Sequence, residues 1–195
     1  MAKRNTHNTK SRIVDAAWQL FYEQGYEDTT VEEIISLSGT SRGSFYHYFE
    51  SKDDLLGSLA YLFDEKYEEL AAALPADTDA FETLLLLNKE LFAMIETRID
   101  VSLLSRLLST QLTVHGSKQL LDRDRVYFKL LRRIVDAGQA RGELTDTLTV
   151  NEIVRMYAML ERALLYDWCL RGGDYALAEY AAKTLPLCLQ QLKKI

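Results

Sequence analysis

The apolar residues recur with the period of an α-helix over most of the chain. In residues 9–24 they fall at i, i+3, i+4, i+7 and i+8, a spacing that places them on one side of a helix. The residues of this stripe are Ile13, Ala16, Ala17, Leu20 and Phe21. Gly25 follows, at a position where helices commonly end in a left-handed residue. No stretch carries a convincing strand pattern, so the sequence predicts an all-α protein.

A short helix is predicted between Thr30 and Gly39. Thr30 and Glu33 have the spacing of a capping box, in which each side chain bonds the backbone N–H of the other residue. The apolar residues of this helix share one face, and they are Val31, Ile34 and Ile35. The glycine predicts a tight turn into the next element.

A second short helix is predicted over residues 42–49, after the N-cap residue Ser41. Phe45 and Phe49 stand four residues apart and predict its buried side. The other side gathers aromatic and hydrogen-bonding residues, namely Arg42, Ser44, Tyr46, His47 and Tyr48. A solvated helix has little use for three aromatic residues in one turn, whereas a helix pressed against phosphates and base edges needs flat donors there. The pattern indicates a DNA-reading element.

The remainder of the chain predicts a larger helical bundle. One long helix is expected over residues 51–74, with Ser51 and Asp54 as its cap and Lys52 in its first turn, where a phosphate can lie. Such a rod, shared by two units, can transmit a tilt. Further helices are expected over residues 80–97, 99–114, 118–141 and 153–170, and a last one after Gly172 and Gly173.

The predicted helix over residues 153–170 is apolar on nearly every side. Its exceptions are Arg155, Glu161, Arg162 and Asp167. Such a helix must be covered twice, once by its own core and once by a partner outside the chain. The partner-facing surface is expected to include residues of the last helix, namely Tyr180, Leu185, Leu189 and Leu192. We expect a homodimer in which two copies pack these helices as a four-helix bundle.

Composition agrees with a soluble helical protein. The 195 residues are 48% hydrophobic and 27% charged, which suits one or two compact units. Residues 1–12 are polar and basic, and no apolar run approaches the roughly 18 residues that a membrane span needs. We therefore expect a cytoplasmic location and no membrane partner. Cys169 and Cys188 stand in apolar helical surroundings and are expected to be buried thiols.

The net charge of −6 argues against a nonspecific nucleic-acid coat. Residues 1–52 contain six Lys or Arg and seven Asp or Glu, but the first twelve residues carry only the basic kind: Lys3, Arg4, Lys10 and Arg12. DNA binding would therefore depend on local placement of charge and on two copies acting together.

Signatures of enzymes are absent from the sequence: there is no glycine-rich phosphate loop, no HExxH pair and no G-x-S-x-G turn. We expect no catalytic activity and no metal or cofactor. The bundle does carry many aromatic residues, which favours a cavity for an apolar or aromatic small molecule. Its candidate lining is Phe63, Tyr67, Phe92, His115, Tyr127, Tyr157 and Trp168. The competing interpretation is an ordinary core for the aromatic residues, and a helix-end or surface position for His115.

Glycines, caps and an aromatic core recur in a fixed register near the start of the chain, at Gly25, Thr29, Thr30, Ile34, Gly39, Ser41, Arg42, Gly43, Ser44, Phe45, Tyr46, Phe49, Ser51 and Lys52. With these residues, the stretch 9–56 resembles the N-terminal helix-turn-helix of TetR-family transcriptional regulators. Thr40 departs from the pattern, because the family usually has an apolar residue such as valine there.

The resemblance implies a division of labour along the chain. Residues 1–50 would be a helix-turn-helix domain that reads double-stranded operator DNA, and residues 51–195 would bind the effector and form the dimer. The implied DNA contacts are Thr30, Ser41, Arg42, Ser44, Tyr46, His47, Tyr48 and Lys52. Repression of a palindromic operator, relieved by a small molecule, is the family's common mode. The alternative is a helical small-molecule-binding or enzymatic bundle whose helix-turn-helix-like start is incidental.

Overall fold

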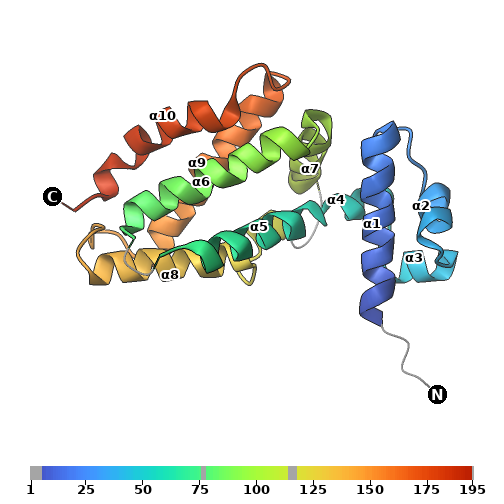
Figure 1. Ribbon diagram of the computed structural model, residues 1–195, viewed down its shortest axis with the longest axis horizontal. Coiled ribbons are helices and arrows are strands. Elements are labelled where there is room, and N and C mark those ends of the chain that lie inside the picture. Colours follow the sequence, from blue (N-terminus) through green and yellow to red (C-terminus); the bar gives the residue numbers. More distant parts are fainter. Residues whose placement is uncertain (1–5, 76–77, 114–117, 195) are drawn as a thin grey trace. The chain divides into compact units, whose positions relative to one another are not determined.

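The regular structure of the chain is helical. The computed structural model describes residues 6–75, 78–113 and 118–194, and Figure 1 shows its helices, with no strand in the described ranges. Their bounds are α1 Thr6–Gln24, α2 Val31–Ser38, α3 Arg42–Tyr48, α4 Lys52–Leu56, α5 Leu59–Ala73, α6 Ala80–Arg98, α7 Val101–Thr113, η1 Gln119–Leu121, α8 Val126–Ala140, α9 Val150–Leu170, α10 Leu177–Leu189 and η2 Gln190–Leu192. The all-α prediction is confirmed.

The chain divides into two compact units, residues 1–59 and 60–195. The predicted division fell after residue 50. The difference arises because α4 is tied to the first unit: the Asp53 carboxylate accepts a hydrogen bond from the Tyr26 hydroxyl, and the Trp18 indole N–H donates to the Ser58 hydroxyl at 2.7 Å.

In the first unit, α2 and α3 pack on α1. Their ends are fixed by local chemistry. Thr30 and Glu33 form the predicted capping box, Gly39 ends α2 with a φ of 59°, and the Ser41 hydroxyl caps α3 by accepting from Ser44 N at 3.0 Å. The interior of this unit is fully buried at Ile13, Ala17, Ile34 and Phe45. The two predicted short helices are therefore confirmed, with the glycine turn between them.

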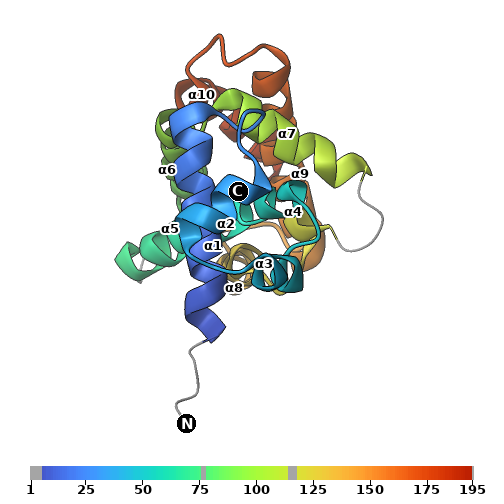
Figure 2. The same ribbon diagram turned by 90° about the vertical axis from the view of Figure 1, so that its right-hand side faces the viewer.

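In the second unit, α6 and α10 lie side by side in both views (Figure 2), and α8 and α9 pack together. Gly138 on α8 lets that helix approach α6, because a Cβ at Gly138 would lie only 2.4 Å from the Cβ of Ala80. The Tyr157 hydroxyl of α9 donates to the Leu84 carbonyl of α6 at 2.8 Å. These contacts make one core that includes α6, α8, α9 and α10.

Two predicted helices differ from the structure. The expected rod over residues 51–74 is interrupted at Gly57 and Ser58, so α4 and α5 are separate helices. Ser51 makes no side-chain cap to α4, and Asp54 instead accepts from Glu50 N at 2.7 Å. The expected helix over residues 118–141 is the short turn η1 followed by α8, because the Asp122 carboxylate accepts from Asp124 N and forms a local turn.

The outer surface of the last two helices also differs from expectation. Leu185, Leu189 and Leu192, expected to face a partner, are at most 2% exposed within their own unit. The large apolar residues that α9 and α10 do expose are Met159, Tyr166, Leu170, Tyr180 and Leu187. Cys188, expected to be buried, is exposed, and Cys169 is half-buried. Among the described residues, no helix is both long enough and apolar enough to span a membrane.

Candidate nucleic-acid interface and candidate ligand cavity

A polar groove runs along α3 in the first unit. Its walls come from α1, from the turn between α2 and α3, and from one side of α3. The lining residues are Thr9, Arg12, Gly39, Thr40, Ser41, Gly43, Ser44, His47 and Tyr48. Hydroxyl, imidazole and guanidinium groups dominate this surface, and these are the groups that bond phosphates and base edges.

Four of the eight residues predicted to contact DNA lie in this groove, namely Ser41, Ser44, His47 and Tyr48. Arg42 and Tyr46 lie outside its walls, and the Arg42 guanidinium stacks 5.7 Å from the centre of the Tyr46 ring. Arg42 also stands 3.6 Å from the Glu32 carboxylate, with both side chains well exposed. An exposed ion pair of this kind is weak, so Arg42 can exchange Glu32 for another partner at little cost.

Thr30 and Lys52 both have structural partners in the first unit. Thr30 forms the capping box with Glu33. The Lys52 ammonium donates to the carbonyl oxygens of Tyr26, Thr29 and Glu27 at 2.5, 2.7 and 3.3 Å. It also lies 4.2 Å from the centre of the Tyr26 ring. An ammonium has three donors, so a phosphate would have to replace one of these carbonyls. Lys52 thus holds the loop between α1 and α2, and its DNA contact remains a prediction.

Arg12 is a groove residue that sequence reasoning did not assign. Its guanidinium donates to the Gly39 carbonyl at 3.0 Å and to the Ser38 carbonyl, where it satisfies the C-terminal end of α2. Thr40 hydrogen-bonds the Ser38 hydroxyl at 2.8 Å, which gives a polar residue a partner within this turn. The partners of Arg12 lie 26 and 27 residues away, beyond the range of any local pattern.

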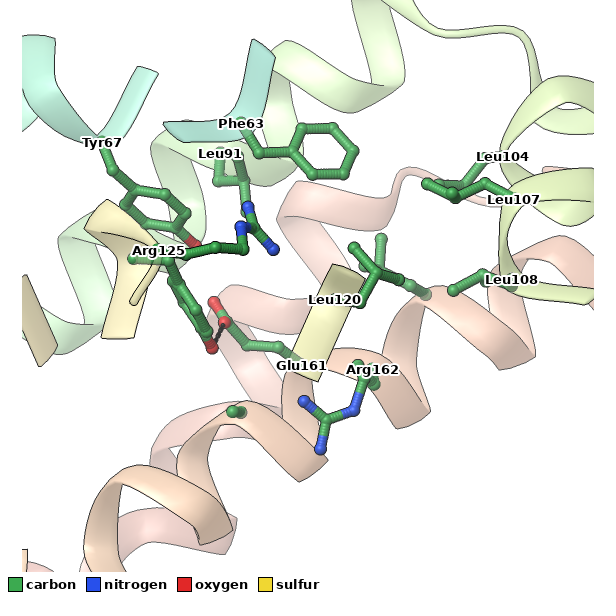
Figure 3. Close-up of a pocket in the computed structure, with 13 residues that line it drawn as sticks. Phe63, Tyr67, Leu91, Leu104, Leu107, Leu108, Leu120, Arg125, Glu161 and Arg162 are labelled. Atoms are coloured by element: carbon green, nitrogen blue, oxygen red, sulfur yellow. Dashed lines mark hydrogen bonds between the residues drawn. The ribbon is translucent and has the colours of Figure 1, made fainter. Parts of the chain in front are cut away.

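The second unit contains a cavity between α5, α6, α7, η1, α8 and α9 (Figure 3), with about 50 Å³ of open space. That space holds only a few water-sized molecules. Most of its wall is aliphatic or aromatic, and the lining residues are Phe63, Tyr67, Leu91, Leu104, Leu107, Leu108, Leu120, Arg125, Tyr127, Ala158, Glu161, Arg162 and Leu165.

A buried carboxyl group forms the polar part of this wall. Glu161 is 4% exposed, and it accepts hydrogen bonds from Asn88 Nδ2 at 2.9 Å and from the Tyr127 hydroxyl at 2.6 Å. Burial raises the pKa of Glu161, although the hydrogen bonds from Asn88 and Tyr127 and the neighbouring Tyr157 hydroxyl oppose that rise. The Tyr67 hydroxyl is also buried, and it has no hydrogen-bond partner in the described part of the chain.

An ion pair closes another side of the cavity. Arg125 donates two hydrogen bonds to the Asp64 carboxylate, both at 3.0 Å, and a third to the Ala60 carbonyl. Asp64 accepts in addition from Tyr127 N at 3.2 Å. Because both charges are largely buried and bonded in a fork, the pair joins α5 to the start of α8 and is close to neutral as a unit.

The structure brings together three of the seven predicted ligand residues, Phe63, Tyr67 and Tyr127. The others do not line this cavity: Phe92, Tyr157 and Trp168 are core residues, and His115 lies outside the described residues. Arg125 and Glu161 were missed. Glu161 is one of two acids, with Asp167, in the nearly apolar stretch 153–170, which was a usable signal. Its bond to Asn88 spans 73 residues and leaves no local pattern.

Residues 13–59 match the family model described as bacterial regulatory proteins of the tetR family. The Fatty acid metabolism regulator protein of Bacillus subtilis is 24% identical over 180 residues, which cover 90% of this chain and 91% of that protein. The HTH-type transcriptional regulator HbdR of Aromatoleum sp. is 26% identical over 186 residues, 93% of this chain and 79% of that protein.

The fold also matches a solved regulator over nearly its whole length. The crystal structure of Thermus thermophilus FadR, a TetR-family transcriptional repressor in complex with lauroyl-CoA, superposes with a TM-score of 0.79 at 24% identity, covering 93% of this chain and 94% of that one. The likeness extends beyond the matched residues 13–59 to the helical bundle. Residues 13–59 are thus a segment of the tetR family of bacterial regulatory proteins, and over most of its length the chain is similar to proteins named as regulators.

Proposed function

We propose that this protein acts in the cytoplasm as a homodimeric repressor that binds a palindromic operator and is released by a small molecule held in the cavity of its second unit. The observation that carries the proposal is that cavity: its apolar wall contains a buried carboxyl group and a buried hydroxyl that has no partner among the described residues. A core built for stability alone has no use for either.

The groove along α3 supports DNA binding. Arg42 is the best candidate for a base edge, because its only ion pair among the described residues is the weak one to Glu32. Removing such an arginine typically costs about 1–3 kcal/mol of base discrimination. Ser41, Ser44, His47 and Tyr48 would hold the phosphates and orient the helix. Two copies would read half-sites roughly 34–36 Å apart, or a multiple of that spacing.

The cavity supports an effector that is mainly apolar and carries a polar group. Its aliphatic wall favours an apolar body. Because the open space is only about 50 Å³, a long chain would enter only if the wall side chains moved apart. Acyl-CoA thioesters are the first compounds to test, since the Thermus thermophilus structure contains lauroyl-CoA and a Bacillus subtilis FadR structure contains stearoyl-CoA.

Coupling between ligand and DNA would pass through α4 and α5. Lys52 opens α4 and holds the α1–α2 loop, while Phe63 and Tyr67 on α5 line the cavity. Because the helix is interrupted at Gly57 and Ser58, the coupling would pass through two separate helices and not through one continuous helix. A coupling of about 1–3 kcal/mol would change operator affinity roughly 5- to 150-fold, and DNA would weaken the ligand by the same factor.

The alternative, an enzymatic or binding bundle with an incidental helix-turn-helix, lacks a comparable observation. The relatives that align with most of this chain are named as regulators. We therefore propose no catalytic role for the cavity residues.

A gel-shift assay on the DNA that flanks this protein's own gene tests the proposal. We expect a discrete complex that dissolves on addition of an effector, and an effector affinity that falls when operator is present. A chain that binds no fragment of that DNA, or a ligand whose affinity is equal with and without operator, would contradict the proposed function.

A further inference from the structure

The cavity of the second unit has two chemically different ends (Figure 3). Tyr67 and Glu161 point into the same end, and Leu104, Leu107 and Leu108 stand at the opposite end. A ligand that fills both ends must therefore have an apolar body and a polar head. The hydrogen-bonding capacity left open at the polar end determines what kind of head fits.

The Tyr67 hydroxyl offers a donor. It is completely buried, lines the cavity and has no partner in the described residues. A buried hydroxyl without a partner destabilises a protein, so such groups call for a specific explanation. A ligand atom that accepts a hydrogen bond would satisfy it.

The Glu161 carboxyl group offers acceptors. Its two oxygens receive one hydrogen bond each, from Asn88 and Tyr127. An ionised carboxylate can accept about four, so capacity for a ligand donor remains. No ion pair joins Glu161 to a cation among the described residues, and the nearby Arg125 is already bonded to Asp64.

The common polar groups differ in how they meet these two needs. A carboxylate head accepts from Tyr67 and is attracted by Arg125 and Arg162, but it cannot donate to Glu161 and brings a second negative charge beside it. An ammonium head donates to Glu161 but cannot accept from Tyr67, and it shares the cavity with Arg125 and Arg162. An ether or thioester accepts but cannot donate. A hydroxyl accepts from Tyr67 and donates to Glu161 without adding a charge.

We infer that the effector cavity recognises an alcohol, with its hydroxyl between Tyr67 and Glu161 and its apolar body along the leucines of α7. This inference rests on the proposed function, because it names the class of compound that would occupy the same cavity. Among ligands that share an apolar body able to fit the cavity, the inference predicts that the head group determines the affinity.

A series of compounds that share an octyl or octanoyl chain tests the preference: octan-1-ol, octyl methyl ether, octylamine, sodium octanoate and octanoyl-CoA. Affinities are measured by calorimetric titration of the full-length chain. We expect octan-1-ol to bind about tenfold or more tightly than the ether, since a hydrogen bond to a charged group is lost in the ether. Equal binding of alcohol and ether, tighter binding of the amine, the acid or the thioester, or failure of all five to bind would overturn the inference.

Two tyrosine variants show whether the site is the one inferred. Tyr67→Phe removes the unpartnered hydroxyl, and we expect a roughly tenfold loss of octan-1-ol affinity with an unchanged or higher melting temperature. Tyr26→Phe is the control, because its buried hydroxyl bonds the Asp53 carboxylate in the first unit and does not line the cavity. It should lower the melting temperature and leave octan-1-ol affinity unchanged. Unchanged affinity in folded Tyr67→Phe would refute the site.

The operator assay separates the two levels of the proposal. If another of the five compounds binds in the cavity more tightly than octan-1-ol and dissolves the DNA complex, the alcohol preference is wrong and the proposed function stands. If octan-1-ol binds as expected but its affinity is the same with and without operator, the alcohol site stands and the proposed release mechanism is wrong.

Discussion

The buried carboxyl group of a single residue, Glu161, makes the stability of the second unit depend on pH. Its carboxyl group lies in the core of the second unit with two hydrogen-bond donors and a raised pKa. A folded-state pKa above the unfolded value means that the folded protein holds the proton more tightly. The stabilisation is complete below the unfolded pKa near 4.5 and is lost as the pH rises through the folded pKa.

Glu161→Gln should therefore reduce the loss of stability with rising pH. Gln accepts from Tyr127, and its amide can donate to a flipped Asn88, so the hydrogen bonds survive without a charge. Above pH 4.5, wild type should fall relative to this variant, with a slope of at most about 1.4 kcal/mol per pH unit. Denaturant unfolding across pH 4 to 8 measures the difference. Glu179→Gln, at an exposed ion pair on α10, is the control, and parallel curves for Glu161→Gln and wild type would contradict the assignment.

Lys52 has two roles that a single substitution can separate. Its ammonium bonds three carbonyls of the α1–α2 loop, so Lys52→Met should lower the melting temperature even without DNA. If it also contacts a phosphate, the variant weakens binding to all sequences and lowers the salt slope by about one. Thermal unfolding and salt titrations of operator binding test both roles, and an unchanged melting temperature would exclude the structural one.

At the scale of elements, local signals predicted α2 and α3 well. The residues that define the helix ends lie within a few positions of those ends: Thr30 with its capping box, Gly39 with its left-handed backbone, and the N-cap Ser41. The break between α4 and α5 left no such signal, because Gly57 keeps an ordinary right-handed φ of −61°. The cavity could not be predicted in detail either, since the bond from Arg125 to Asp64 spans 61 residues.

Two glycines of the helix-turn-helix should respond oppositely to alanine. Gly39 has a φ of 59°, and an added Cβ would lie 2.7 Å from the Arg12 guanidinium. Gly39→Ala should therefore destabilise the first unit by at least about 1–2 kcal/mol and weaken operator binding. Gly43 lies inside α3 with its nearest neighbour at 3.8 Å, so Gly43→Ala should stabilise by up to about 1 kcal/mol. Thermal unfolding of both variants checks the pair, and a neutral Gly39→Ala would show that the turn tolerates a side chain.

At the scale of the whole molecule, the exposed apolar surface of α9 and α10 is the proposed dimer interface. Leu187 is 72% exposed and Tyr180 is 47% exposed, and both line one hollow with residues of α9. A monomer rarely leaves such residues grouped together without a partner. The leucines first expected there, such as Leu185, are core residues. A charge at Leu185 would therefore test folding and not association.

Leu187→Glu should shift the protein from dimer to monomer in sedimentation at micromolar concentration and weaken binding to a palindrome far more than binding to a half-site. The reason is the cost of burying an unpaired charge in an apolar interface. Leu112→Glu is the matched control, because Leu112 is 73% exposed on α7. A dimer that survives Leu187→Glu, or a monomeric wild type, would place the interface elsewhere or remove it.

The division after residue 59 also bears on how such a regulator can evolve. Residues 1–59 and 60–195 are each compact, and the chain passes between them at the short α4–α5 junction. A genetic crossover near codons 57–60 would transfer a complete DNA-reading unit without splitting either compact unit. Lineages can in this way connect an existing operator to a new chemical signal in one recombination event.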